Sequence, residues 1–60
     1  MKAQFTIFAG SLVEVETDPG SLCVKIRVRK PGATDQFELG FTRSEARAVA
    51  SALMGAAQEL

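Results

Sequence analysis

The chain has 60 residues, and its seven basic and seven acidic side chains give a formal net charge of zero at pH 7. This length allows one domain at most, near the lower limit for folding alone, where a disulfide, a metal or a partner is often needed. One cysteine and no histidine exclude an internal disulfide and an ordinary zinc site. Association is therefore favoured, and a nucleic-acid binder that relies on excess basic charge is disfavoured.

The N-terminal residues contain no apolar run of the length that a signal peptide or a membrane span requires. The lone thiol of Cys23, without an export signal, indicates a reducing, cytoplasmic setting. We expect a soluble domain that uses no metal, cofactor or membrane.

Residues 2–8 are predicted to form the first strand. A three-residue connection with Gly10 in the left-handed conformation leads to a second strand over residues 12–17, where valines alternate with glutamates. This connection places Phe5 opposite Val15 on the apolar side of the sheet.

The third strand is predicted over residues 22–30, where every second residue is apolar and the others are mostly basic. This period of two marks a strand with one buried face. The fourth strand, over residues 34–41, continues the pattern with Phe37, Leu39 and Phe41 on the apolar side.

Two Pro-Gly turns, at residues 18–21 and 30–33, join the last three strands. Proline suits the first central position of such a turn, and glycine can take the positive φ of the second. The turns place Val15 opposite Val24, and Val24 opposite Leu39. Both turns direct the same residues of the third strand inward, and a slip of one residue in either would mix the two faces.

A helix is predicted over residues 43–59. Thr42 and Glu45 have the spacing of a capping box, which marks a helix start. The apolar residues that follow recur at helical spacing: Ala46, Val49, Ala50, Leu53, Ala57 and Leu60. The expected fold is α+β, a four-stranded antiparallel β-meander of order 1-2-3-4 with one C-terminal α-helix packed on its apolar face (ββββα).

The first candidate binding surface is basic and lies at one end of the predicted sheet. It consists of Arg27, Arg29 and Lys30. The predicted register places Lys25 between Glu14 and Glu38, in an ordinary cross-strand charge group. The remaining basic residues could contact phosphate, or could belong to a solvated surface whose ion pairs contribute little.

Two further candidate surfaces are weakly polar. Phe8 and Leu12 are expected side by side on the outer face, in the row of Arg27, where they resemble the centre of a small interface. The alternative is that Phe8 belongs to the core. The back of the helix presents small residues that permit close contact with another helix, or that are simply good helix formers: Ala48, Ala52 and Gly55.

No catalytic group is expected. Cys23 is predicted to lie beside Glu16 and Gly40 with no histidine to act as its base, and a neighbouring carboxylate raises the pKa of a thiol. The glutamates would lie on an open sheet face with nothing to exclude water. We therefore expect a protein without enzymatic activity.

The favoured function is a small protein-interaction module, acting as a homodimer or as a subunit, inhibitor or regulator bound to another protein. The alternative is a single-stranded nucleic-acid-binding domain that uses its exposed sheet face. A meander followed by a helix resembles, in topology alone, the Pur-type repeats and Whirly-type domains, which bind in this way. Such binders stack bases on aromatic side chains, and only Phe8 is expected to be available.

Overall fold

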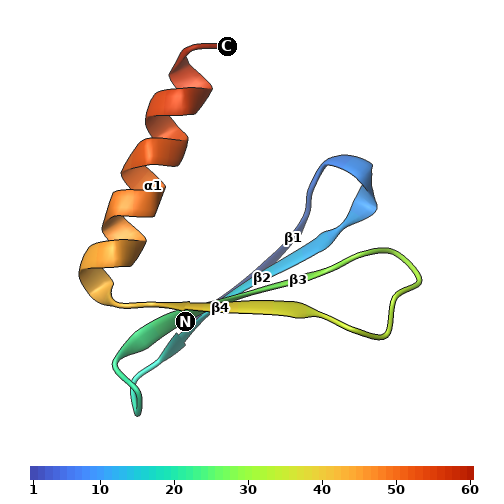
Figure 1. The fold of residues 1–60 in the computed structure, drawn as a ribbon, viewed down its shortest axis with the longest axis horizontal. Coiled ribbons are helices and arrows are strands. Elements are labelled where there is room, and N and C mark those ends of the chain that lie inside the picture. The colour runs from blue at the N-terminus through green and yellow to red at the C-terminus, as the bar shows by residue number, and fades with distance from the viewer.

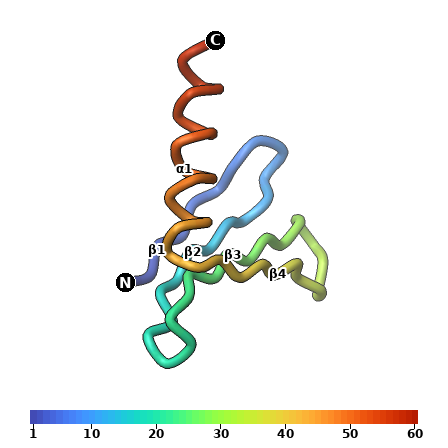
Figure 2. Tube along the Cα trace, turned by 60° about the vertical axis from the view of Figure 1, so that its left-hand side comes forward, coloured from blue at the N-terminus to red at the C-terminus, as the bar shows by residue number.

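The computed structural model describes residues 1–60, which form four strands and one C-terminal helix (Figures 1 and 2). The elements are β1 (Lys2–Thr6), the short 3-10 turn η1 (Phe8–Gly10), β2 (Leu12–Asp18), β3 (Cys23–Arg29), β4 (Phe37–Phe41) and α1 (Arg43–Gln58). All neighbouring strands are antiparallel, in the order β1-β2-β3-β4. The predicted ββββα meander is confirmed.

The sheet has an inner face, from which α1 rises, and an outer face. Cross-strand partners order the inner face in three rows: Thr17, Val24 and Phe41 next to the helix start; then Ala3, Val15, Ile26 and Leu39; then Phe5, Val13, Val28 and Phe37. The outer face carries the charged residues of the same strands. Strict alternation along each strand therefore separates apolar from charged side chains, as expected.

The register within the sheet differs from the prediction by two residues in every hairpin. Val15 lies opposite Ile26 and not Val24, and Phe5 lies opposite Val13 and not Val15. Leu39 likewise lies opposite Ile26. A shift of two residues keeps every side chain on its own face, so the alternating pattern is equally satisfied by both registers.

The turn between β2 and β3 explains the shift in the central hairpin. Leu22, and not Gly20, adopts the left-handed conformation, with φ 55°. Its amide donates to the carbonyl of Pro19 at 3.3 Å, and the Ser21 amide donates to the Asp18 carboxylate at 3.3 Å. The loop therefore includes Leu22, and β3 begins at Cys23.

The other two connections are also longer than predicted. The Ala33 amide donates to the Lys30 carbonyl at 3.1 Å, and Gly32 has φ 74°, so the second Pro-Gly turn forms as expected. Residues 34–36 follow this turn without pairing to β3, and strand pairing resumes at Phe37. Between β1 and β2 the connection contains η1, which begins at Phe8. Both Ala9 and Gly10 in it have a positive φ.

Helix α1 begins directly after β4, with Thr42 as the only residue between them. The capping box is present: the Glu45 amide donates to the Thr42 hydroxyl at 3.2 Å, and the Thr42 amide donates to the Glu45 carboxylate at 2.9 Å. From this junction the helix projects away from the sheet (Figure 1). Its main contacts are with β3 and β4.

The divergence of helix and sheet leaves the chain with almost no enclosed core. Val13, 9 % exposed, is the one buried residue. The overall extents of 36 × 33 × 16 Å describe a flat, two-armed molecule. No helix of the chain combines the length and the apolar character that crossing a membrane requires.

Replacing the helix cap gives the first prediction. In Thr42→Ala the hydroxyl acceptor of the Glu45 amide is lost, so the free energy of unfolding falls by about 1 kcal/mol. Denaturant unfolding followed by circular dichroism measures this. Ser44→Ala is the matched control, because Ser44 makes no side-chain hydrogen bond within the chain, and equal effects of both substitutions would contradict the capping role.

The second prediction concerns Leu22, whose left-handed conformation is unfavourable for leucine. Leu22 is exposed, and asparagine tolerates its conformation better than leucine, so Leu22→Asn raises the free energy of unfolding by up to about 1 kcal/mol. Gly20→Ala should be tolerated, because Gly20 does not have a positive φ. A loss of stability in Gly20→Ala without a gain in Leu22→Asn would instead support the shorter turn.

Candidate protein interface

The most conspicuous surface of the molecule is apolar. It lies on the inner face of the sheet and on the apolar stripe of the helix, where the two elements are no longer in contact. We call it the open apolar surface, and it consists of Phe5, Phe37 and Leu39 on the sheet with Val49 and Leu53 on the helix. All five side chains are exposed. It is the part of the inner face and of the helix stripe that would form the core if the two arms were in contact.

Exposure increases along β4 and along α1 away from the junction. On β4, Phe41 is half-buried and Phe37 is 61 % exposed. On α1, Ala46 is half-buried, Val49 is 38 % exposed and Leu53 is 66 % exposed. The two gradients show that helix and sheet separate progressively from the Thr42 junction outward.

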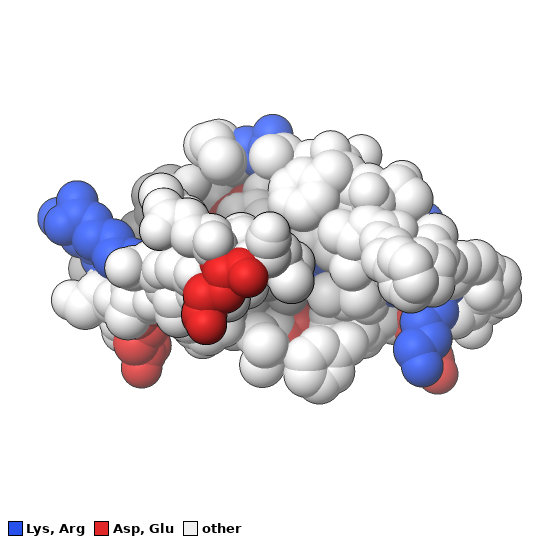
Figure 3. Space-filling view, turned by 90° about the horizontal axis from the view of Figure 1, so that it is seen from above, with Lys and Arg blue, Asp and Glu red and all other residues white.

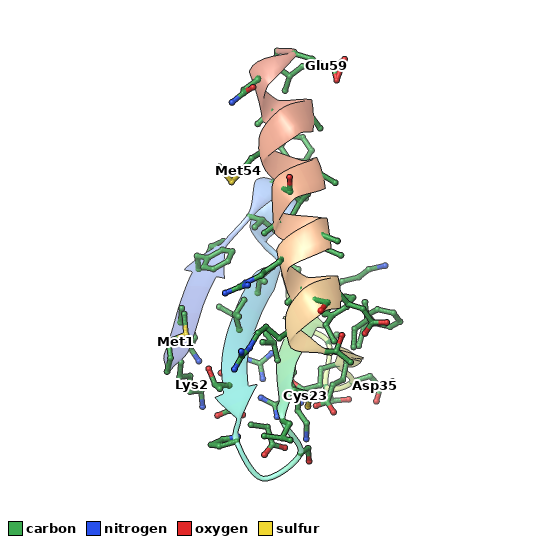
Figure 4. All side chains as sticks on the ribbon, turned by 90° about the vertical axis from the view of Figure 1, so that its left-hand side faces the viewer. Met1, Lys2, Cys23, Asp35, Met54 and Glu59 are labelled. Carbon is green, nitrogen blue, oxygen red and sulfur yellow. The ribbon has the colours of Figure 1, made fainter.

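The helix side of this surface is uncharged over most of its length. Residues 48–58 contain no acidic or basic side chain, although that whole stretch is exposed. Met54 projects sideways from the upper half of α1, and Glu59 lies at the end remote from the sheet (Figure 4). Seen from above, the molecule is mostly uncharged (Figure 3). An exposed helix of this composition is typical of one that packs against another element.

The outer face is organised around Arg27. Its guanidinium contacts three carboxylates on both neighbouring strands: Nε donates to Glu38 at 2.7 Å, and Nη1 donates to Glu16 at 3.2 Å and to Glu14 at 3.3 Å. These hydrogen bonds raise the pKa of Arg27, with the Glu38 bond as the largest cause. The arginine thus ties β2, β3 and β4 together.

Other polar side chains extend this charge network. Gln4 donates to the Glu14 carboxylate, and Lys2 lies 3.6 Å from the same group. These contacts and Arg27 hold the pKa of Glu14 below its usual 4.5, with the Gln4 hydrogen bond as the largest cause. At the turn, Lys25 lies 3.3 Å from Asp18 and lowers the pKa of that carboxyl, with help from hydrogen bonds to Ser21.

The predicted basic surface is altered by this arrangement. Arg27, and not Lys25, lies between Glu14 and Glu38, so its charge is already compensated. Arg29 and Lys30 remain exposed and form none of the ion pairs in the chain.

The expected pairing of Phe8 with Leu12 is wrong. Phe8 lies in η1 and is 96 % exposed, beyond the end of β1. Leu12 lies opposite Thr6 and Arg29 and is half-buried. Leu12 therefore shares its row with Arg29 and not with Arg27. The structure separates Phe8 from this surface because the β1–β2 connection is longer than predicted. Leu12, Arg27 and Arg29 still line one hollow on the outer face, together with Gln4, Glu14 and Gln36.

The remaining predicted residues fall on the outside of the helix and at the sheet end. Ala48, Ala52 and Gly55 are exposed, and a side chain built at Gly55 would meet nothing within 4 Å. Cys23 lies opposite Asp18, so its expected placement beside Glu16 and Gly40 is corrected. No three His, Cys, Asp or Glu side chains are placed so that together they could hold a metal ion.

A groove runs between the β2–β3 turn and the first turns of α1. Its lining residues are Thr17, Asp18, Pro19, Leu22, Cys23, Val24, Arg43, Ala46 and Arg47. The groove lies where helix and sheet are in contact, and Arg43 and Arg47 make no ion pair there. It brings no histidine or second thiol to Cys23, because the chain has neither.

The open apolar surface is the feature that sequence reasoning missed, because its residues were assigned to a core beneath the helix. A signal was present in the side-chain sizes. The inner face carries Phe5, Phe37 and Phe41, whereas the helix stripe within α1 contains only Val49 and Leu53 as large residues. A stripe of alanines covers too little area to bury such a face.

No family model, curated protein or solved structure matches this chain.

The charge network predicts a characteristic dependence of stability on pH. A carboxyl with a pKa lowered by folding stabilises the native state above its unfolded pKa, and this stabilisation is lost as the pH falls through the folded value. In Arg27→Gln the pKa of Glu14 moves up towards 4.5. The variant is therefore less stable than the wild type at pH 7, and the two curves converge as the pH falls through the folded pKa of Glu14.

Denaturant unfolding between pH 7 and pH 2, with NMR titration of the Glu14 carboxyl, checks this prediction. Arg29→Gln is the matched control, because it removes an unpaired arginine from the same strand and should follow the wild type throughout. An Arg27→Gln curve that runs parallel to the wild type at every pH would contradict the role given to the network.

Proposed function

We propose that this chain is a non-enzymatic protein-interaction module whose fold is completed when another polypeptide covers the open apolar surface. The observation that carries the proposal is that Val13 alone is buried, while large apolar residues on both arms remain exposed. Burial of apolar surface is the main favourable contribution to folding. A chain that encloses so little of it on its own gains most of that contribution by association.

The exposed area supports this proposal quantitatively. The accessible surface of the chain is 4888 Å². A compact monomer of 6.4 kDa is expected to expose about 3,800 Å². The difference of about 1,100 Å² per chain exceeds the area of about 800 Å² that each partner contributes to a standard protein–protein interface.

The chemistry of the remaining surfaces agrees with a binding role. Cys23 faces Asp18, and the chain has no histidine that could act as a base for nucleophilic chemistry at its thiol. The lone thiol also supports action in a reducing compartment such as the cytoplasm.

The single-stranded nucleic-acid alternative receives less support from the same surfaces. Phosphate binding requires uncompensated basic charge. Arg27 is held by three carboxylates on the outer face, so the predicted basic surface keeps only Arg29 and Lys30 as unpaired residues. The phenylalanines of β1 and β4 are on the inner face, so the outer face offers no aromatic side chain for base stacking.

Two phenylalanine substitutions test the proposal. If the purified protein already carries a covering polypeptide on the open apolar surface, Phe37→Ser lowers its free energy of unfolding by more than about 2 kcal/mol. Phe8→Ser is the matched control. It removes an exposed ring outside that surface, so its effect stays within about 0.5 kcal/mol.

Binding of the dye ANS completes the test, because a purified chain that lacks its partner should bind the dye and unfold without cooperativity. The proposal fails if the purified chain is a monomer that excludes ANS, unfolds cooperatively and tolerates both substitutions equally.

A further inference from the structure

We propose that the polypeptide covering the open apolar surface is a second copy of this chain, in a two-fold symmetric dimer where α1 of each copy lies against the inner face of the other. This inference rests on the proposed function and names its partner. The neutral charge of the chain, the area left exposed and the properties of α1 together carry it.

The area fits a dimer that forms together with the fold. Each chain exposes about 1,100 Å² beyond the expectation for a compact monomer of its mass. Two copies that removed this excess from water would bury about 2,200 Å² in total, which falls in the range of obligate dimers.

The chain itself supplies an element that fits its own inner face. Residues 48–58 of α1 form an uncharged helical segment, and the 16 residues of α1 give a helix about 24 Å long. The seven-residue strand β2 has a similar length of about 23 Å. The exposed helix and the exposed inner face belong to one chain. A two-fold axis therefore places the helix of each copy on the inner face of the other, and both surfaces are covered in both copies.

The charges permit this pairing. The formal net charge is zero, so two copies do not repel each other over long range. The charged residues of α1 lie in its first two turns: Arg43, Glu45 and Arg47 precede the uncharged segment, and the C-cap residue Glu59 follows the helix. No charge need be buried when the middle of the helix meets an apolar face.

Closure of α1 onto its own inner face is the competing arrangement, and the Thr42 junction opposes it. Only Thr42 separates β4 from α1, and both of its capping-box hydrogen bonds with Glu45 are formed. A downward swing of the helix would have to reorient this one residue and its cap. A second copy can bind to the inner face without any reorientation of Thr42.

Mass and contacts between chains test the dimer. Light scattering of the wild type at micromolar concentration should give twice 6.4 kDa. Leu53→Glu should weaken the dimer by about a hundredfold, because it places a charge at the centre of the interface. Ala48→Glu adds the same charge on the other side of α1 and should leave the mass at two chains. The expected NMR result, for a mixture of isotope-labelled and unlabelled wild type, is filtered contacts between Leu53 methyl groups and the Phe5 or Phe37 ring.

Each other outcome has a defined meaning. A monomer that folds cooperatively, independently of concentration, overturns both this inference and the proposed function. A monomer that lacks cooperative structure overturns the inference alone, because the module then requires a different partner. A two-chain mass without the filtered contacts overturns the proposed arrangement. A two-chain mass abolished by Ala48→Glu and not by Leu53→Glu also overturns it, and assigns the interface to the back of the helix. The filtered contacts use the wild type, so the test does not depend on the folding of a variant.

Discussion

The direction of α1 is set at Thr42, where the chain passes from the last strand into the helix through a single residue. The hydroxyl and amide of Thr42 are both engaged with Glu45, so the first turn of the helix is held in place relative to β4. A longer connection would allow the helix to lie along the inner face. With this short one, the helix leaves the sheet at an angle, and the rising exposure along β4 and α1 follows from that constraint.

The sheet does not depend on the helix for its strand order. Arg27 joins carboxylates from the strands on either side of it, at 2.7 to 3.3 Å, and the ladders pair residues along every strand. Individual ion pairs at a surface contribute little, but a network spanning three strands favours one alignment of them. The two faces thus have separate roles: the outer one specifies register through charge, and the inner one carries the area available for burial.

The sequence was sufficient for strand number, strand order, the facing of side chains and the helix start. Alternation with a period of two identifies faces, and the Thr42–Glu45 spacing identifies a cap. The same period is insensitive to shifts of two residues, so the pairing of Val15 with Ile26 was not accessible from it. The deciding feature was local backbone geometry, in which Leu22 adopts a conformation that is unfavourable for leucine and that the pattern suggested for Gly20.

The site was less predictable than the fold. The composition indicated that association was favourable, but the angle between helix and sheet depends on the geometry of one junction, which periodicity does not encode. The candidates on the outer face were chosen because they differ from an ordinary polar surface: Phe8 and Leu12 are apolar, and the basic residues are clustered. Phe37 and Leu53 gave no such signal, because apolar residues at inward positions fit an ordinary core.

The small enclosed core also determines how the chain would be treated inside a cell. Backbone that is not protected by packed side chains opens readily and is a substrate for proteases. A chain whose core is completed by association is protected only while it is associated, so unassociated copies are degraded faster than associated ones. The abundance of the protein would then follow the supply of its partner, and for a self-associating chain it would rise more steeply than its rate of synthesis. Turnover would thus limit the pool of unpartnered apolar surface, which is the form of the protein most prone to aggregate.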